Sequence, residues 1–246
     1  MHQFTFTFQH QAMAADANGW AQWEMRRETR VVPAARVAII ICDMWDNHWS
    51  RGASERVNIM APRMNQVLHA ARNRGAHILH APSETMPFYV NSPARQRMLE
   101  LPDTPLPIAK EHPAPSLPID ASDHGSDTGE NSTFKAWSRQ HPALEIDEGR
   151  DGISDNGEEI YRYLQQQQIE QVLIMGVHTN MCVLNRSFAI KQMVRWGVSI
   201  ALVRDLTDAM YNPAMSPYVS HDEGVQLVIG YIEKFWCPTM ESGQLA

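Results

Sequence analysis

Cysteine is scarce in this chain of 246 residues, which contains only Cys42, Cys182 and Cys237. No pair of them has the Cys-x-x-Cys spacing of a zinc knuckle. Three widely separated cysteines also argue against the disulfide framework that holds small secreted domains together. We therefore expect the reducing cytoplasm as the compartment of this protein.

Long hydrophobic runs and clustered charges are missing too. No apolar run approaches the roughly 20 residues that span a membrane, and the first residues lack the apolar core of a signal peptide. The formal charge of −7 is modest and is not gathered into a tail, which argues against nucleic acid or a membrane as a partner. Neither a Gly-x-Ser-x-Gly elbow nor a glycine-rich phosphate loop occurs. A small molecule is the expected partner.

Short apolar runs do occur, and they alternate with segments of helical spacing. This order predicts an α/β fold in which helices cover both faces of a mostly parallel sheet. We expect residues 35–246 to form one domain and residues 1–34 to form a β extension or a dimerisation arm. The expected strands cover residues 4–8, 20–32, 37–42, 76–81, 143–146, 172–175 and 198–203, and the expected helices cover residues 61–74, 155–164, 182–196 and 218–235.

One long stretch, at about residues 100–137, fits neither kind of element. Prolines crowd its first part, and acidic residues, serine and glycine crowd the rest. That composition excludes a helix or a central strand. Because a loop of this length in a compact domain is usually a lid, a binding loop or disordered, we expect it to pass over a pocket or to contact another subunit.

Two polar residues stand where buried strands end: Asp43 after Val37–Cys42, and Cys182 after Val172–Met175 and a polar turn. The carboxyl ends of parallel strands form the ligand-binding edge of such sheets, so we expect the two side chains to converge. A helix N-terminus lowers the pKa of a thiol, and a carboxylate within reach takes its proton. The alternatives are a small apolar core residue for Cys182 and a cap for Asp43.

The same edge supplies candidates for a substrate pocket. Aromatic and imidazole groups there would wall a small cavity, and the polar turn before Cys182 would add hydrogen-bonding groups. The candidates are Trp45, His48, Thr179, Asn180 and Tyr211.

These motifs resemble those of the isochorismatase-like cysteine hydrolases, the superfamily of nicotinamidase, isochorismatase and N-carbamoylsarcosine amidohydrolase. The segment from Gly176 to Val183 stands where the family shows Gly-x-x-Thr-x-x-Cys-Val, and the order of elements agrees over most of the chain. The resemblance implies a three-layer α-β-α fold of Rossmann-like topology and a triad of Asp, Lys and Cys. Asp43 would be the general base and Cys182 the nucleophile.

The resemblance also implies a cis peptide between Val177 and His178, with the N–H groups of His178 and Cys182 forming an oxyanion hole. Members of the superfamily commonly form dimers or larger oligomers, so a homo-oligomer is expected, and the N-terminal arm would suit it.

The lysine of the family's triad is missing from its expected place. At the end of the strand that precedes the helix at 155–164, the sequence reads Glu148-Gly149-Arg150. Glu148 matches the position better and would add a second carboxylate, which raises the pKa of one of the pair. Arg150 would restore the charge but could not shuttle a proton. Lys135, which lies upstream in the long loop, is a remote substitute for the family's lysine.

We expect no metal and no other cofactor. Nicotinamidases of this superfamily carry an Asp-x-His pair after the second strand, where this chain has Ala81–Glu84. Asp46-x-His48 has the spacing of a ligand pair but follows the first strand. A zinc ion near His48 and His80, with Glu84, is the alternative, and a pocket wall is the favoured use of His48.

The sequence thus predicts a hydrolase that acts on C–N bonds other than peptide bonds. It would cleave a small amide or carbamoyl-type substrate through a thioester on Cys182. One alternative is a family member that has lost catalysis with its lysine and serves as a ligand-binding or scaffold protein. The other is a vinyl-ether hydrolase that does not need the cysteine.

Overall fold

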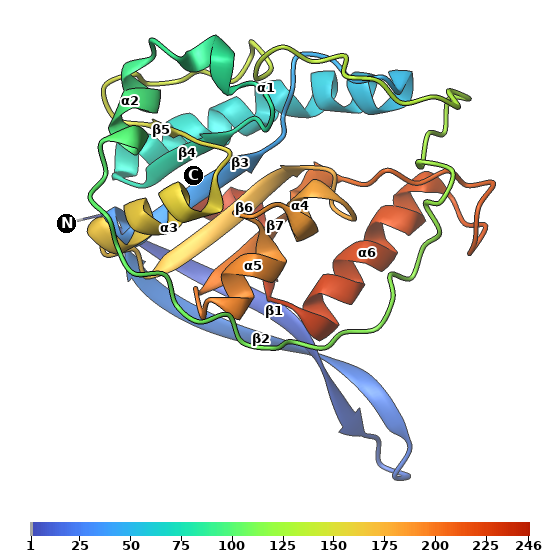
Figure 1. The fold of residues 1–246 in the computed structure, drawn as a ribbon. Helices are drawn as coiled ribbons and strands as arrows, with labels where there is room; N and C mark the ends of the chain where they lie inside the picture. Colours follow the sequence, from blue (N-terminus) through green and yellow to red (C-terminus); the bar gives the residue numbers. More distant parts are fainter. Residues whose placement is uncertain (1) are drawn as a thin grey trace.

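The computed structural model describes residues 2–246, and its centre is an eight-stranded sheet of order β2-β1-β8-β7-β6-β3-β4-β5 (Figure 1). The strands from β8 to β5 pair in parallel, whereas β1 is antiparallel to both β2 and β8. The strands are β1 (Gln3–Ala15), β2 (Ala21–Pro33), β3 (Val37–Cys42), β4 (His77–Ala81), β5 (Gly152–Ile153), β6 (Gln171–Val177), β7 (Ile200–Asp208) and β8 (Thr239–Met240).

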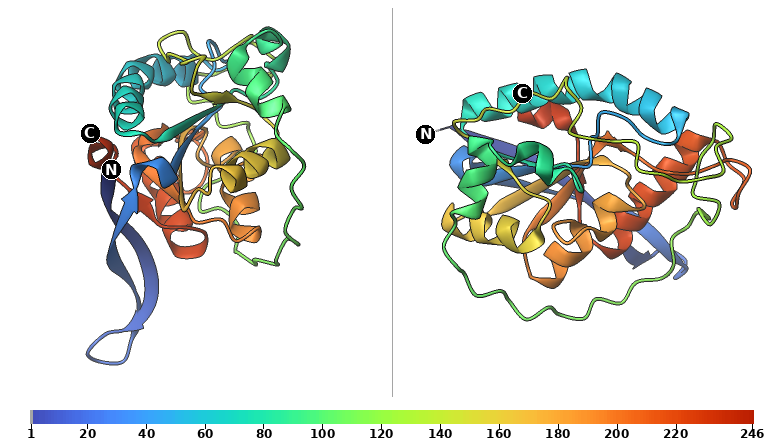
Figure 2. Two further views of the ribbon diagram at one scale, coloured as in Figure 1. Left: turned by 90° about the vertical axis from the view of Figure 1, so that its left-hand side faces the viewer. Right: turned by 45° about the horizontal axis from the view of Figure 1, so that its top comes forward.

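Helices cover the sheet on both faces, which confirms the three-layer α/β architecture (Figures 1 and 2). One face packs against α1, and the other packs against α3, α4, α5 and α6. The α-helices are α1 (Arg51–Arg74), α2 (Pro93–Leu99), α3 (Gly157–Gln166), α4 (Cys182–Asn185), α5 (Ile190–Arg195) and α6 (His221–Phe235), and the 3₁₀ helices are η1 (Ala34–Arg36), η2 (Met86–Tyr89) and η3 (Ser242–Leu245). None of the helices among residues 2–246 is long and apolar enough to cross a membrane.

The central pair of strands, β3 and β6, brings the two predicted strand ends together. Every residue of both strands is buried, as continuous apolar runs predict. Cys42 lies opposite Gly176 in the parallel register. A Cβ on Gly176 would lie 2.1 Å from the Cys42 carbonyl oxygen, so only glycine permits this close approach. Gly176 is therefore part of strand β6, and the expectation that this strand ends at Met175 was wrong.

Three expected elements differ in the structure. Helix α1 begins at Arg51 rather than at residue 61. Ser50 caps it there, and residues before Pro62, such as Ala53 and Val57, belong to its buried face. Residues 143–146 form turns instead of a strand. The helix expected over 182–196 is two short helices, because the chain is extended at Arg186, where ψ is 155°.

The N-terminal strands β1 and β2 form a long hairpin that projects from the body (Figure 2). Strand β1 buries Phe4, Phe6 and Phe8, whereas β2 is exposed at every residue except Val32. Residues 100–151 form neither helix nor strand, and they run around the molecule from α2 to the carboxyl edge of the sheet.

Candidate active site

Asp43 lies at the carboxyl end of β3, fully buried and with a φ of +46°. Both of its carboxylate oxygens have charged or backbone donors. The backbone N–H of Ser83 donates to Oδ1 at 2.8 Å, and Nε of Arg186 donates to Oδ2 at 2.9 Å. Burial raises the pKa of Asp43, while the charge of Arg186 and the hydrogen bonds oppose that rise. A buried carboxylate with a raised pKa is suited to accept a proton.

Arg186 is a candidate site residue that sequence reasoning missed, since it contacts Asp43. It follows Cys182 by four residues and stands at the C-terminal end of α4. Residues four apart on a helix lie on one face, so a single turn carries the thiol and the cation toward Asp43. The sequence signal was the spacing Cys-x-x-x-Arg directly after the family motif.

Cys182 is the first residue of α4, as expected, and its thiol lies close enough to the Asp43 carboxylate for each group to shift the pKa of the other. Burial, together with the neighbouring charge of Asp43, raises the pKa of this thiol well above its ordinary value, although Arg186 opposes the rise. The expected lowering of the thiol pKa was wrong, because α4 has four residues and the dipole of so short a helix is small beside the cost of burying a thiolate. The resting pair is therefore a thiol next to a carboxylate.

The turn between β6 and α4 is held rigidly. The peptide bond between Val177 and His178 is cis. The N–H of Thr179 donates to the Asp208 carbonyl, and the side chain of Asn180 bonds both the N–H and the carbonyl of Met210. These contacts tie the turn to the end of β7, so the structure places Thr179 and Asn180 where they position the cysteine segment.

His178 points its ring into the protein rather than to solvent. The residue is 2% exposed, and its Nε2 has no hydrogen-bond partner among the described residues. Burial lowers the pKa of His178 to about 3, so the ring is neutral at physiological pH. The backbone N–H of His178 lies near the Cys182 thiol and lowers its pKa, and among the described residues neither this N–H nor that of Cys182 donates to an oxygen.

Aromatic rings wall the cavity next to Asp43. The ring of Trp137 stacks on that of Trp45, with centroids 4.1 Å apart and planes at 9°, and His48 stacks beside both. Burial lowers the pKa of His48 to about 4. The cavity, which Asp43 and His178 also line, has a volume of about 10 Å³, roughly the space of one water molecule.

Trp137 is the second residue that the sequence did not indicate, because it belongs to the long loop. Just after it, Ser138 donates from its N–H and its hydroxyl to the carboxylate of Asp46, at 2.9 and 2.6 Å. The loop thus packs against Trp45, which lines the cavity, and Asp46 acts as the anchor of the loop.

Several candidates lie away from Asp43. Glu148 caps α2 by accepting hydrogen bonds from the hydroxyl of Ser92 and the N–H of Ala94. Arg150 pairs with Asp147 at the surface. Neither is brought to the site, because the chain before α3 turns toward α2.

Lys135, Tyr211 and His80 are also used elsewhere. Lys135 is exposed and donates to the backbone carbonyl of Glu84. Tyr211 is fully buried, and its hydroxyl donates to the Met215 carbonyl. His80 is buried between Gln140 and Asp151, away from His48. Among residues 2–246, no three potential ligands converge as a metal site.

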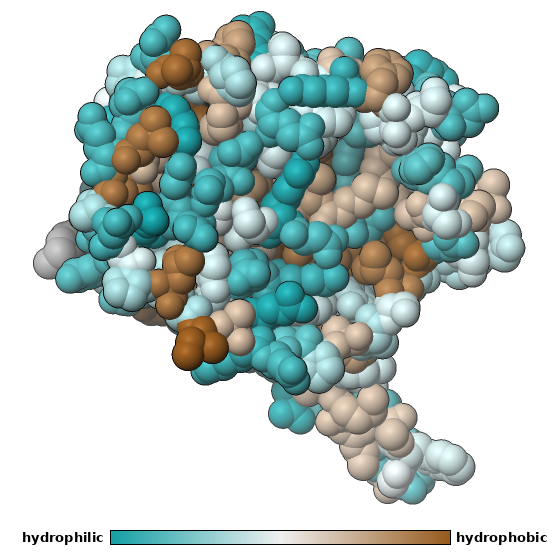
Figure 3. All heavy atoms as spheres, in the orientation of Figure 1, coloured by the Kyte–Doolittle hydropathy of each residue, from teal (hydrophilic) through white to brown (hydrophobic). Residues whose placement is uncertain are grey.

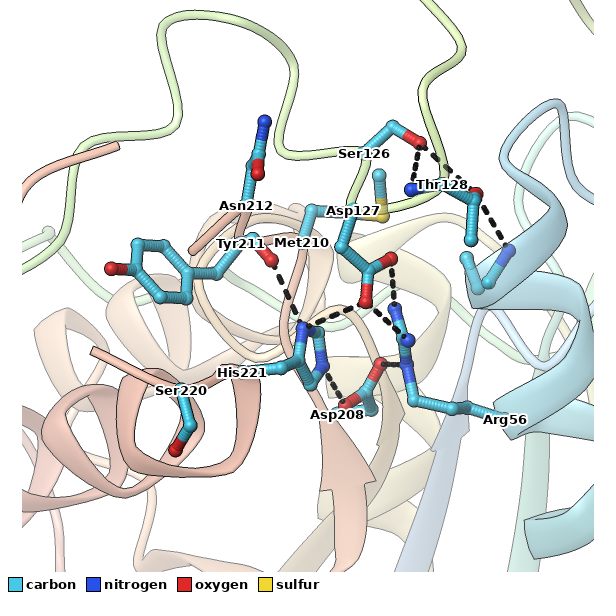
Figure 4. A network of polar contacts seen from close by, with 12 residues as sticks. Arg56, Ser126, Asp127, Thr128, Asp208, Met210, Tyr211, Asn212, Ser220 and His221 are labelled. Atoms are coloured by element: carbon cyan, nitrogen blue, oxygen red, sulfur yellow. Dashed lines mark hydrogen bonds and ion pairs between the residues drawn. The ribbon is translucent and has the colours of Figure 1, made fainter. Parts of the chain in front are cut away.

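Four charged side chains fix the long loop to the rim of the sheet (Figure 4). Arg56 of α1 pairs with Asp127 of the loop at 2.8 Å and with Asp208 of β7 at 2.9 Å. On the other side, His221 contacts Asp208 through Nε2 at 2.9 Å and the Tyr211 carbonyl through Nδ1 at 2.9 Å. Because both ring nitrogens face acceptors, the geometry requires the doubly protonated ring.

The stability of the protein should therefore depend on the charge of His221. Burial opposes that charge, but the hydrogen bond and the charge of Asp208 outweigh it and raise the pKa of His221. A raised pKa contributes stability below the unfolded value of about 6.5, and that contribution is lost as the pH rises through the folded value. We expect His221→Gln to lower the free energy of unfolding more at about pH 5.5 than at about pH 9, measured by urea denaturation.

His77 offers a control, because the pH dependence of its contribution to stability should have the opposite sign. Burial lowers the pKa of His77, so its neutral ring contributes stability that falls as the pH drops below about 6.5. The effect of His77→Gln should then shrink on acidification. Equal effects of His221→Gln at both pH values would contradict a charged His221.

Comparisons with known proteins show the family and the fold to which this chain is similar. A family model of the Isochorismatase domain matches residues 37–215. A cysteine hydrolase from Pseudomonas syringae pv. phaseolicola 1448A has a similar structure, with 14% identity, a TM-score of 0.53 and coverage of 86% of this chain and 91% of the other. An isochorismatase from Pseudomonas putida KT2440 has 14% identity, a TM-score of 0.50 and coverage of 87% and 92%. At these identities the likeness concerns the fold. A search of the curated proteins finds no match.

Proposed function

Since this chain belongs to the isochorismatase family of hydrolases, we propose that it cleaves a small amide or carbamoyl-type substrate through a thioester on Cys182. The observation that carries the proposal is the convergence of three groups: the thiol of Cys182, the buried carboxylate of Asp43 whose charge raises the pKa of that thiol, and the guanidinium of Arg186, which lies 2.9 Å from the carboxylate. Nucleophile, base and cation are the parts that acyl transfer requires.

In the first half of the reaction, Asp43 takes the proton from the Cys182 thiol as the sulfur adds to the substrate carbonyl. The pKa of the thiol is raised, so the thiolate forms only during attack, when Arg186 is beside it to stabilise the charge. The N–H groups of His178 and Cys182 would hold the oxyanion. The C–N bond then breaks, and Asp43 gives its proton to the leaving nitrogen.

In the second half, Asp43 removes a proton from water as the water oxygen attacks the thioester carbonyl. The C–S bond breaks, the acid is released, and Asp43 returns the proton to the sulfur. Arg186 takes no part in proton transfer because its pKa is too high. All proton transfers therefore pass through Asp43, and Arg186 acts by its charge alone.

The closeness of the site favours a small substrate. Trp45 and Trp137 stack on each other with centroids 4.1 Å apart, so no ligand fits between the two rings. The cavity beside Asp43 has a volume of only about 10 Å³. Primary amides and N-carbamoyl compounds of a few heavy atoms are the smallest members of the proposed substrate class.

The test is a panel of small amides, N-carbamoyl compounds and a vinyl ether, assayed for product and by intact-mass spectrometry of samples quenched in acid. We expect turnover of at least one amide or carbamoyl compound and an acyl adduct on Cys182. Turnover of the vinyl ether alone, without an adduct, would favour the cysteine-independent alternative. Binding of panel members without any turnover would favour a ligand-binding protein.

A further inference from the structure

Strand β2 is an open edge of the sheet. It stands last in the strand order, bonded to β1 on one side only, and twelve of its thirteen residues are exposed. The backbone groups of such an edge are a template for pairing with another strand. Figures 1 and 2 show the hairpin of β1 and β2 projecting from the body, so no other element among residues 2–246 covers this edge.

The charges on this edge alternate in sign along one face of the strand. Glu24, Arg26, Glu28 and Arg30 are consecutive side chains of that face, since strand side chains alternate between faces. Within the chain they already pair, Arg26 with Glu24 at 3.4 Å and Arg30 with Glu28 at 2.7 Å. A run of one sign would repel a second copy, whereas an alternating run can complement itself.

One symmetric register pairs all four of these charges. Two identical edge strands that pair antiparallel are related by a two-fold axis perpendicular to the sheet, so opposite residues share a face. With the axis at Arg27, Glu24 lies opposite Arg30 of the second copy. In the same register Arg26 lies opposite Glu28, and each pair occurs twice.

Other registers pair fewer charges or set like charges against each other. An axis at Met25 would pair only Glu24 with Arg26, and an axis at Thr29 would pair only Glu28 with Arg30. An axis at Arg26 would set that residue against itself and Glu24 against Glu28. An axis at Glu28 would set Arg26 against Arg30. Like charges directly opposite each other destabilise a strand pair, whereas opposite charges contribute roughly 0.2–1 kcal/mol each. In the favoured register the one like-charge contact is Arg27 with its own copy, on the other face.

The other face gains apolar contacts in this register. Trp23 would lie opposite Val31, and Met25 would lie opposite Thr29. Val31 is 58% exposed and Met25 is 40% exposed in the single chain. Figure 3 shows the hairpin standing clear of the body with apolar as well as polar atoms on its surface. A second copy would cover these side chains.

We propose that β2 pairs antiparallel with β2 of a second copy of this chain, with the axis at Arg27, so that the two sheets become one across a symmetric dimer. The partner is a second copy because all four charges of this face lie opposite a charge of the other sign in this register. This assembly is independent of the chemistry proposed for Cys182.

Charge swapping tests the proposal on the full chain. One variant carries Glu24→Arg and Glu28→Arg, which makes the face uniformly positive, and the other carries Arg26→Glu and Arg30→Glu, which makes it uniformly negative. By size-exclusion chromatography with light scattering, we expect the wild type to be a dimer and each variant alone to be a monomer. An equimolar mixture of the two variants should restore a dimer, because every opposite pair is then complementary.

A matched control exchanges the exposed pair Arg51 and Glu55 of α1, which lie 3.2 Å apart. Arg51→Glu with Glu55→Arg should leave the dimer intact, and circular dichroism should show native folding in all variants. A monomeric wild type, dimers in both charge variants alone, or a mixture that stays monomeric would each overturn the proposal.

Discussion

Replacing Cys182 by alanine is expected to lower kcat/KM by roughly 10⁴-fold or more for any amide or carbamoyl compound that the wild type hydrolyses. The reason is that the other two thiols cannot replace it: Cys42 and Cys237 are buried, and the Cys42 thiol donates to the Val177 carbonyl. The substitution removes one sulfur atom from a half-buried side chain, so the fold should persist. The measurement is steady-state kinetics together with a thermal melt, and the acyl adduct should vanish from the mass spectrum.

Cys237→Ala is the matched control for this variant. Cys237 is buried in the apolar cluster that includes α6, so its substitution should leave kcat/KM unchanged while lowering the melting temperature slightly. Turnover that survives in Cys182→Ala would refute the thioester mechanism. If Asp43→Ala is inactive at the same time, that result would indicate cysteine-independent hydrolysis.

Substituting Arg186 by methionine is expected to lower kcat/KM by about 10²- to 10³-fold, the typical cost of removing one electrostatic partner of a reacting charge. It should also move the acid limb of the pH–rate profile to higher pH. The charge of Arg186 opposes the rise that burial causes in the pKa of Asp43. Without that charge the carboxylate binds its proton more tightly, so the basic form appears only at higher pH.

Arg186→Lys separates charge from shape in this prediction. It keeps the positive charge, so the acid limb should return toward its wild-type position even if kcat/KM is only partly restored. The control is Glu148→Ala, at the position nearest to the family's lysine. Loss of this cap should cost about 1 kcal/mol of stability without altering the pH profile. A shifted limb in Glu148→Ala, with none in Arg186→Met, would reverse the assignment.

The sheet and the meeting of Asp43 with Cys182 could be predicted from the sequence. Both residues follow continuous apolar runs, and such runs identify buried parallel strands whose carboxyl ends share one edge. The start of α1 could not be predicted, because Pro62 reads as a first-turn residue although the helix continues through it.

The cation and the outer wall of the site could not be predicted in the same way. Periodicity cannot show that the chain becomes extended at Arg186, since the apolar spacing resumes in α5. Trp137 reaches Trp45 from a loop whose composition identifies no element, and hydrogen bonds of Ser138 and Arg139 with Asp46 fix its place. The pKa of the Cys182 thiol depends on burial, which spacing does not reveal.

The short distance along the chain between Cys182 and Arg186 also bears on how such proteins are classified. A triad lysine contributed by a distant segment can be lost by one mutation there, and its absence then suggests a dead enzyme. A cation encoded one helical turn after the nucleophile is inherited together with it. Family members that lack the lysine but keep arginine at this spacing should therefore be assayed before they are counted among the inactive ones.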